Sequence, residues 1–384
     1  MALMPWQIPG APAEEGEERH RRIRAEMADR GIDCLLIAGL TANYGDRSGV
    51  FRWVCNYAPW FDDEYILFPR QGEPVLCAWS IGHASWAKRV SWVPTVWVGK
   101  LKYVEFLVNR IRELGCGAGS IGLEFQGTPA YVFRGIAERL PEAKFVDTTD
   151  MFARLRMIKS PFELECMQRS AYVGDEGIRA LLEVARPGVT DREAWAAMDY
   201  RMTLAGAQTP TFCLMTSFSS YAQKGQAIPY GPSDRVMRPN DGIVNEIGPS
   251  YIGYITQICR PVALGRPEAE FERTFELHLR MYEAAIKLVR PGIAIQDIDA
   301  EVKEIAAGAA ISRSAWAMQH VGMLNTDKIP PETKLQAGMT LVVHPYTDHD
   351  GGEYGGHIVG DTVVVTEDGC RRLSDLPYDE IMRA

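Results

Sequence analysis

Histidines are concentrated near the C-terminal end of the chain, where they could support proton transfer or bind a metal. Four of the seven, His320, His344, His349 and His357, fall within residues 320–384. A neutral imidazole exchanges protons near neutral pH and is also a common metal ligand. His349 and His357 lie in a glycine-rich stretch, for which a solvent-exposed or supporting role is an equally good interpretation. The C-terminal part is therefore the first candidate region for a catalytic or metal-binding site.

A second candidate region, residues 51–61, is dense in aromatic side chains and is followed by Asp62, Asp63 and Glu64. Aromatic faces and carboxylates together favour a small cationic or aromatic ligand, through cation–π attraction and charge. Ordinary packing between domains is the alternative interpretation.

Composition narrows the classes of function. The net charge of −9 leaves little basic surplus to neutralise a nucleic acid backbone. No apolar stretch approaches the roughly 18 residues that span a bilayer, and the N-terminus has no secretory signal pattern. The eight cysteines are dispersed without a C-x-x-C pair, which is typical of reduced thiols. We expect a cytoplasmic protein with neither a nucleic acid nor a membrane as partner.

Helix and strand patterns alternate through the first 150 residues. Helical periodicity over 14–30 precedes a short apolar run at 34–38, and a hairpin is expected around the turn at 69–72. Helices at 104–114 and 130–140 alternate with strands at 121–125 and 144–146. This alternation predicts a small α/β domain over residues 1–150.

The remainder, residues 151–384, contains a repeated layout. A long helix starts at Ser160-Pro161 and stops at Arg186-Pro-Gly, and another stops at Arg290-Pro-Gly, 104 residues later. A further helix and a strand-rich segment follow each breaker. We expect an internally duplicated domain in which helices surround a curved antiparallel sheet, with the active site in the crease between the halves. The fold class is α/β (α+β).

Several phrases, read in order, resemble those of a known family. Leu155-Arg-Met-Ile-Lys-Ser160, Glu367-Asp-Gly369 and Leu376-Pro-Tyr378 are similar to segments of creatinase. The chain thus resembles the creatinase/prolidase/aminopeptidase P family, whose catalytic domain has the pita-bread fold. The resemblance implies a homodimer in which the N-terminal domain contributes to the partner's site. It thereby makes Trp60 and Phe61, in the aromatic stretch, candidate substrate-binding residues.

Peptidases of that family bind two metal ions through five side chains. By resemblance these positions fall on Glu246, Gln257, His320, His344 and Gly360. A glutamine bridges metals poorly and a glycine supplies no ligand, so we expect no dinuclear site. The family's substrate-side histidine falls on Pro229, which also speaks against creatinase's own mechanism.

The residues left at these positions can still transfer protons. The resemblance makes Glu246, His320 and His344 the candidate catalytic residues. Candidate substrate-binding residues are Gln257, Cys259, Tyr254 and His357, and Arg260 is expected to pair with a carboxylate. Alternatively, Glu246, His320 and His344 would suit one divalent ion, Zn or Fe.

Taken together, the sequence predicts a metal-independent hydrolase without a cofactor that cleaves a C–N bond in a small non-peptide substrate, as creatinase and ectoine hydrolase do. One alternative is a lyase or a mononuclear metalloenzyme with a rebuilt site. The other is a non-catalytic protein that uses the pita-bread cleft for binding.

Overall fold

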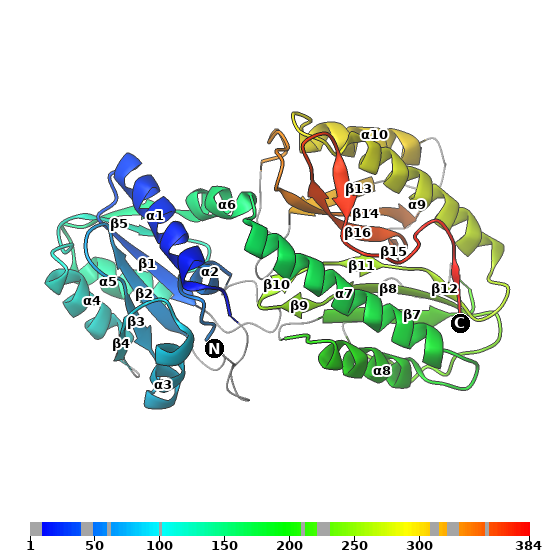
Figure 1. Ribbon diagram of the computed structural model, residues 1–384, viewed down its shortest axis with the longest axis horizontal. Coiled ribbons are helices and arrows are strands. Elements are labelled where there is room, and N and C mark those ends of the chain that lie inside the picture. Colours follow the sequence, from blue (N-terminus) through cyan, green and yellow to red (C-terminus); the bar gives the residue numbers. More distant parts are fainter. Residues whose placement is uncertain are drawn as a thin grey trace. The chain divides into compact units, whose positions relative to one another are not determined.

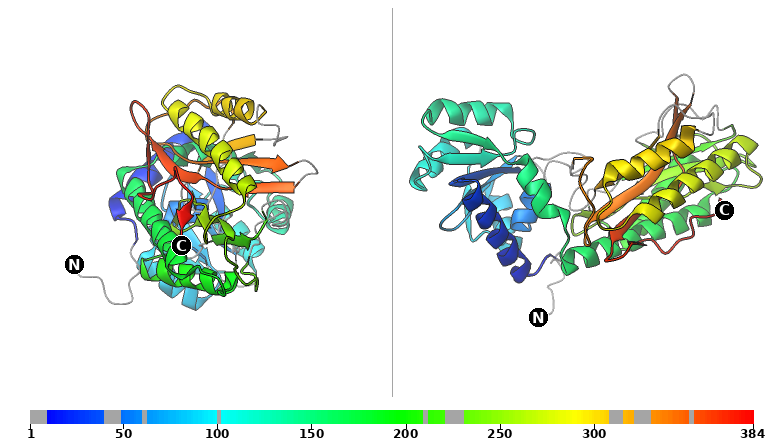
Figure 2. Two further views of the ribbon diagram at one scale, coloured as in Figure 1. Left: turned by 90° about the vertical axis from the view of Figure 1, so that its right-hand side faces the viewer. Right: turned by 90° about the horizontal axis from the view of Figure 1, so that it is seen from above.

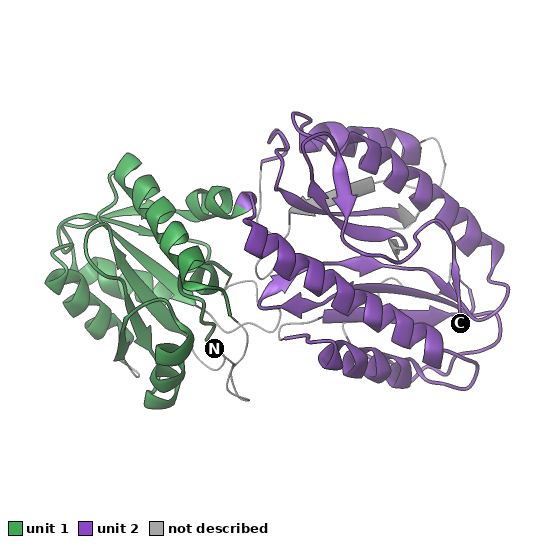
Figure 3. Cartoon of the chain, in the orientation of Figure 1, with its two compact units in different colours: residues 1–156 green, residues 157–384 purple. Residues whose placement is uncertain are grey.

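The computed structural model describes residues 10–39, 49–59, 63–99, 102–208, 212–220, 231–307, 315–320, 330–349 and 353–384. For residues 315–320, 348–349 and 353–357 the description covers the backbone alone. The chain divides into two compact units, residues 1–156 and 157–384 (Figure 3). Among the described helices, none has the length and apolar character needed to cross a membrane.

The first unit is a mixed six-stranded sheet with helices. The strand order is β4-β3-β2-β1-β5-β6, and β1 pairs antiparallel with β2 and parallel with β5. Its elements (Figure 1) are α1 (Ala13–Asp29), β1 (Cys34–Gly39), α2 (Gly49–Cys55), β2 (Glu64–Pro69), β3 (Val75–Ala78), α3 (Ile81–Val90), β4 (Thr95–Val98), α4 (Tyr103–Glu113), β5 (Ser120–Leu123), α5 (Ala130–Arg139), β6 (Lys144–Asp147) and α6 (Thr149–Met157). The expected α/β architecture of this part is confirmed.

The described part of the aromatic segment 51–61 packs inside this first unit. Phe51 and Trp53 on α2 are completely buried, and Tyr57 just after the helix is almost so. These three side chains therefore belong to the packing of the first unit itself, and the two interpretations of the segment stay predictions for its other residues. Trp60 and Phe61 lie outside the described residues.

The second unit is built on a ten-stranded sheet in which β13-β14-β16-β11-β8-β12-β18 are neighbours in that order. The pairings are antiparallel except that β12 runs parallel to β18. Its elements are α7 (Pro161–Val184), α8 (Asp191–Leu204), β7 (Phe212–Phe218), β8 (Gly242–Gly248), β9 (Ser250–Tyr251), β10 (Tyr254–Ile255), β11 (Ile258–Cys259), β12 (Val262–Ala263), α9 (Ala269–Leu288), α10 (Ile295–Ala307), β13 (Ala315–His320), β14 (Thr340–His349), β15 (Glu353–His357), β16 (Gly360–Val365), β17 (Cys370–Arg372) and β18 (Met382–Arg383).

The expected duplication of this unit is visible in its backbone. The glycine of each Arg-Pro-Gly breaker has a positive φ, 94° at Gly188 and 88° at Gly292. Glycine adopts such a φ without steric cost. The Gly188 amide donates to the Met237 carbonyl at 2.9 Å, and the Gly292 amide donates to the Leu335 carbonyl at 2.9 Å. The same chain reversal therefore follows α7 and α9.

The equivalence continues into the sheet. Asn240 and Gly338, which both have positive φ, precede β8 and β14. The Asn240 amide donates to the Leu264 carbonyl, as the Gly338 amide does to that of Val365. Strands β8 and β14 are therefore equivalent in the two halves, and so are the segments that end at Leu264 and Val365.

Two helix pairs supply the core of the second unit. Ile243, Ile247 and Ile258 pack with apolar residues of α7 and α8. Leu341 and Val343 pack with apolar residues of α9 and α10. The helices of each pair lie beside the strands of their own half, and Figure 2 gives two further views of them. Because strand residues alternate between faces, Glu246 lies on the face opposite Ile243 and Ile247, and His344 lies on the face opposite Leu341 and Val343.

Helix α7 begins where its sequence signals predict. The Ser160 side chain accepts a hydrogen bond from the Glu163 amide, and the Glu163 carboxylate accepts one from the Ser160 amide. Pro161 occupies the first turn, where its missing N–H costs nothing. This reciprocal cap fixes the start of the long helix that packs under β8 and β11.

Candidate active site

Four candidate positions form one row across four neighbouring strands. Cys259 on β11 pairs directly with Gly360 on β16. In the ladder between β14 and β16, Val343 pairs with Asp361, so the next residues along the two strands, His344 and Gly360, lie opposite each other. The ladder between β8 and β11 likewise sets Glu246 opposite Cys259. Cross-strand neighbours project from the same face, so the row is Glu246, Cys259, Gly360 and His344.

Gly360 brings two members of the row close together. A Cβ placed on Gly360 would lie 2.6 Å from His344 Cβ, 3.3 Å from His344 Cα and 3.2 Å from Cys259 Sγ. The first of these distances is shorter than real Cβ contacts allow. Glycine at this position therefore leaves room for His344, and any larger residue would collide with the stem of that histidine.

The duplication relates the two ends of the row. Glu246 lies six residues after Asn240, and His344 lies six residues after the equivalent Gly338. The carboxyl and the imidazole therefore occupy equivalent places in the two halves. Neighbouring strands are about 4.8 Å apart, so the three spacings from β8 to β14 separate the two backbones by about 14 Å. The two side chains stand at opposite ends of the row, with the intervening strands between them.

The duplication also relates the two residues in the middle of the row, Cys259 and Gly360. Cys259 lies five residues before Leu264, and Gly360 lies five residues before Val365. Both positions are buried. A thiol and a glycine thus form a small, uncharged floor between the carboxyl and the imidazole.

Glu246 is poised to exchange protons. Burial raises the pKa of its carboxyl group to about 7, because desolvation disfavours the charged form. At neutral pH both protonation states are then well populated, which is what a general acid or base needs. This shift was not foreseen from the sequence, where Glu246 was selected by position alone.

Cys259 is a poor nucleophile in this setting. Its side chain is completely buried, and burial first, then the nearby Glu246 carboxylate, raise the pKa of its thiol. Reactive cysteines have lowered pKa values and partial exposure. The thiol therefore contributes shape and an uncharged surface.

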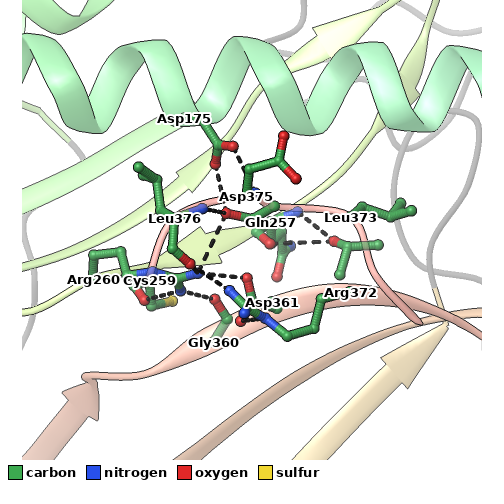
Figure 4. A network of polar contacts seen from close by, with 12 residues as sticks. Asp175, Gln257, Cys259, Arg260, Gly360, Asp361, Arg372, Leu373, Asp375 and Leu376 are labelled. Atoms are coloured by element: carbon green, nitrogen blue, oxygen red, sulfur yellow. Dashed lines mark hydrogen bonds and ion pairs between the residues drawn. The ribbon is translucent and has the colours of Figure 1, made fainter. Parts of the chain in front are cut away.

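Gln257 comes just before β11, two residues before Cys259. Alternation places the two side chains on one face. Its backbone amide donates to Thr362 Oγ1 at 2.8 Å, and the Thr362 hydroxyl donates to its carbonyl at 3.2 Å. The side chain of Gln257 is buried, beside the network shown in Figure 4.

A buried ion pair supports the row from the opposite face. Arg260 and Asp361, the residues that follow Cys259 and Gly360, are completely buried and 2.7 Å apart. The Arg260 guanidinium also donates to the carbonyls of Cys259 and Gly360, each at 2.8 Å (Figure 4). The expectation that Arg260 pairs with a carboxylate is confirmed, and the pair ties β11 to β16 directly beneath the row.

Two further groups complete the bonding of Asp361. The hydroxyl of Tyr282 on α9 donates to its carboxylate at 2.7 Å, and Arg372 on β17 donates at 3.0 Å. Each carboxylate oxygen thus has a charged or neutral donor. Hydrogen bonds to both oxygens offset part of the cost of burying this carboxylate.

The sequence comparisons fit this architecture. Residues 165–367 match the profile of metallopeptidase family M24, and residues 19–158 match the creatinase/prolidase N-terminal domain. The first match alone covers more than half of the chain.

The chain belongs to metallopeptidase family M24.

Within M24, relatives with different named activities are similarly distant. The Xaa-Pro dipeptidase of Pyrococcus furiosus is 26% identical over 300 residues, covering 75% of this chain and 81% of that protein. The ectoine hydrolase of Halomonas elongata is also 26% identical, covering 95% of this chain and 96% of that protein. The solved X-Pro aminopeptidase of Thermotoga maritima, 20% identical, superimposes with a TM-score of 0.81 over 95% of this chain and 99% of its own. This last likeness supports the fold alone.

The row does not supply the donors that the resemblance implies for a pair of metal ions. The row supplies one carboxylate and one imidazole, and Gly360 has no space for a ligand beside His344. In the part of the chain that the structure describes, no three His, Cys, Asp or Glu side chains could hold a metal ion together. Bridging a metal pair requires carboxylates that these positions lack.

Tyr254, a candidate substrate contact, makes a structural contact inside the second unit, and its role toward a substrate stays a prediction. Its side chain is completely buried, and its hydroxyl donates to the Glu163 carboxylate at 2.9 Å. Since Glu163 also caps α7, this bond fastens β10 to the start of the helix. The resemblance placed Tyr254 near the site but could not show which partner its hydroxyl takes.

Four remaining candidates lie at strand ends or outside the described residues. His320 is the last residue of β13, where its backbone pairs with Leu341, and His357 ends β15 opposite Tyr346. The side chains of both histidines lie outside the described residues, as do Trp60, Phe61 and Pro229. The roles expected of His320 and His357 stay predictions, as does the homodimer.

The close contact between Gly360 and His344 can be tested by adding a side-chain carbon at position 360 and removing the side chain at position 344. We expect Gly360→Ala to lower the free energy of unfolding by about 1–3 kcal/mol, the range for overpacking. In the double variant Gly360→Ala/His344→Gly the collision is relieved, so the two effects should be strongly non-additive in a double-mutant cycle. Urea unfolding followed by circular dichroism measures both.

A nearby glycine provides the control for that exchange. A Cβ added to Gly369, in the turn after β16, would meet only Thr366 Oγ1, at 4.0 Å. Gly369→Ala should leave the free energy of unfolding within about 0.5 kcal/mol of the parent, as surface substitutions do. Simple additivity of the 344 and 360 substitutions would show that the two positions do not collide.

Proposed function

We propose that this chain is a hydrolase that cleaves a C–N bond in a small non-peptide substrate through a carboxyl–imidazole pair. The observation that carries the proposal is the row itself. Glu246 and His344 occupy equivalent places in the two halves, and between them lie an uncharged thiol and a glycine. The pair occupies positions that hold metal ligands in the family's peptidases, by the resemblance of the sequence.

The chemistry follows from the protonation of Glu246. With a pKa of about 7, its carboxylate form accepts a proton from water as that water attacks the carbon of an amide or amidine. The water oxygen bonds to that carbon, the C–N bond then breaks, and the departing nitrogen takes a proton from His344 acting as the general acid. The two groups take different tasks, one activating the water and the other protonating the leaving nitrogen, and the substrate would lie over the uncharged middle of the row between them.

The named relatives support different substrate classes. The Halomonas elongata ectoine hydrolase resembles this chain over almost the whole length of both proteins, and its name denotes a non-peptide substrate. The Pyrococcus furiosus relative is a dipeptidase that covers 75% of this chain. The row favours the first class, since peptide cleavage in the family depends on metal ligands that Gln257 and Gly360 do not supply.

The test compares the two classes directly. Purified protein is assayed against a panel of small amides, cyclic amidines and guanidino compounds, with Xaa-Pro dipeptides as the alternative, before and after treatment with a chelator. Bound metal is quantified by mass spectrometry in the same samples. Turnover of a non-peptide compound that survives the chelator supports the proposal. Dipeptide cleavage that requires about one or two equivalents of metal overturns it.

A further inference from the structure

A threonine hydroxyl holds the peptide groups on both sides of Gln257. Thr362 follows Asp361 on β16, and its side chain is buried. The ladder between β11 and β16 pairs Ile258 with Asp361 and Cys259 with Gly360. Gln257 comes just before β11, and the Thr362 hydroxyl extends the connection between the two strands to this residue.

The hydroxyl lies on the face that carries the row. Thr362 pairs with Val342 on β14, and residues two apart on a strand share a face, so Thr362 projects from the same side as Gly360 and His344. It therefore lies at the level of the candidate site, on the side opposite the Arg260–Asp361 pair.

We propose that Thr362 is a positioning residue, whose hydroxyl fixes the backbone of Gln257 and so aims the Gln257 carboxamide at the substrate. The hydroxyl both accepts from and donates to the backbone of one residue, which restricts the peptide planes on its two sides. A carboxamide on a restrained backbone loses less entropy when it binds a ligand. The proposal rests on the function proposed above, because it requires a substrate over the row.

The test uses three variants. Thr362→Val keeps the shape and removes the hydroxyl, and Thr362→Ser keeps the hydroxyl. The matched control is Thr274→Val on α9, where another buried threonine hydroxyl donates to the Glu270 carbonyl at 2.9 Å, away from the row. Steady-state kinetics on the compound turned over by the parent, amide hydrogen exchange at Gln257 and thermal unfolding are measured for each.

The expected pattern separates positioning from general stability. Thr362→Val should raise KM about tenfold and speed exchange at the Gln257 amide, with a smaller effect on kcat. Thr362→Ser should restore both values, and Thr274→Val should lower the melting temperature without changing KM. A Thr362→Val enzyme with parental KM and parental exchange overturns the proposal. So does a Thr362→Ser enzyme as impaired as the valine variant.

Failure of the proposed function gives a different result. A parent protein that turns over no compound of the panel overturns the hydrolase assignment itself. Hydrogen exchange at Gln257 still decides the hydroxyl contact in that case, since it needs no substrate. Faster exchange in Thr362→Val alone supports the contact, and equal exchange in all variants refutes it.

Discussion

Replacing Glu246 with glutamine is expected to lower kcat/KM for C–N hydrolysis by about 10²- to 10⁴-fold, the range for removing a general acid or base. The parent enzyme should show a kinetic pKa near 7, because burial raises the pKa of the Glu246 carboxyl to that value. The pH dependence of kcat/KM for both proteins measures this. Glu380→Gln, at an exposed acid of the same unit, is the control and should behave as the parent.

The same substitution should show how much the desolvated Glu246 carboxyl lowers the free energy of unfolding. Because the pKa of Glu246 is higher in the folded state than in the unfolded state, the folded protein retains a proton that the unfolded chain releases above about pH 4.5. The parent should therefore lose stability relative to Glu246→Gln as pH rises from about 4.5 to about 7. One pKa unit corresponds to about 1.4 kcal/mol, so the difference reaches roughly 3 kcal/mol. Denaturant unfolding across this pH range measures it, and a pH-independent difference would contradict the raised pKa.

Removing the Asp361 carboxylate should have the largest effect on stability. Asp361→Ala leaves the completely buried Arg260 guanidinium without its ionic partner. Breaking one side of a buried pair costs about 3–5 kcal/mol, since the remaining charge stays desolvated. Tyr282 and Arg372 lose their bonds to the same carboxylate. Urea unfolding of the purified variant measures the loss.

Two further variants serve as comparisons for Asp361→Ala. Asp368→Ala removes an exposed acid whose carboxylate accepts from Thr366 at 3.2 Å, and it should change the free energy of unfolding by less than about 0.5 kcal/mol. The double variant Arg260→Met/Asp361→Ala removes both charges and should be more stable than Asp361→Ala alone. If Asp361→Ala matched the exposed control, the pair would contribute nothing to the fold.

The fold of this chain was predictable because its signals are local or repeated. Ser160-Pro161 predicts the start of α7. The two Arg-Pro-Gly breakers predict the duplication, which the positive φ of Gly188 and Gly292 confirms. The capping and breaking of a helix depend on a few consecutive residues. Such signals survive in a single sequence without knowledge of tertiary contacts.

The site was predictable in outline but not in its energetics. Position alone selected Glu246, yet its raised pKa depends on burial by residues distant in the sequence. The contact between Gly360 and His344 requires the register of β14 against β16, which no sequence pattern specifies. The partner of the Tyr254 hydroxyl was missed for the same reason, because Glu163 lies 91 residues away.

The placement of the row on four different strands bears on how new reactions arise in this fold. Each row residue alternates with neighbours that pack or pair on the opposite face, so a substitution at 246 leaves the core contacts of that strand in place. Positions 344 and 360 are different, because a side chain at 360 requires a concurrent change at 344 or a shift of β16 against β14. The chemistry of the crease can thus diversify quickly in one half, while the other half must evolve through linked steps.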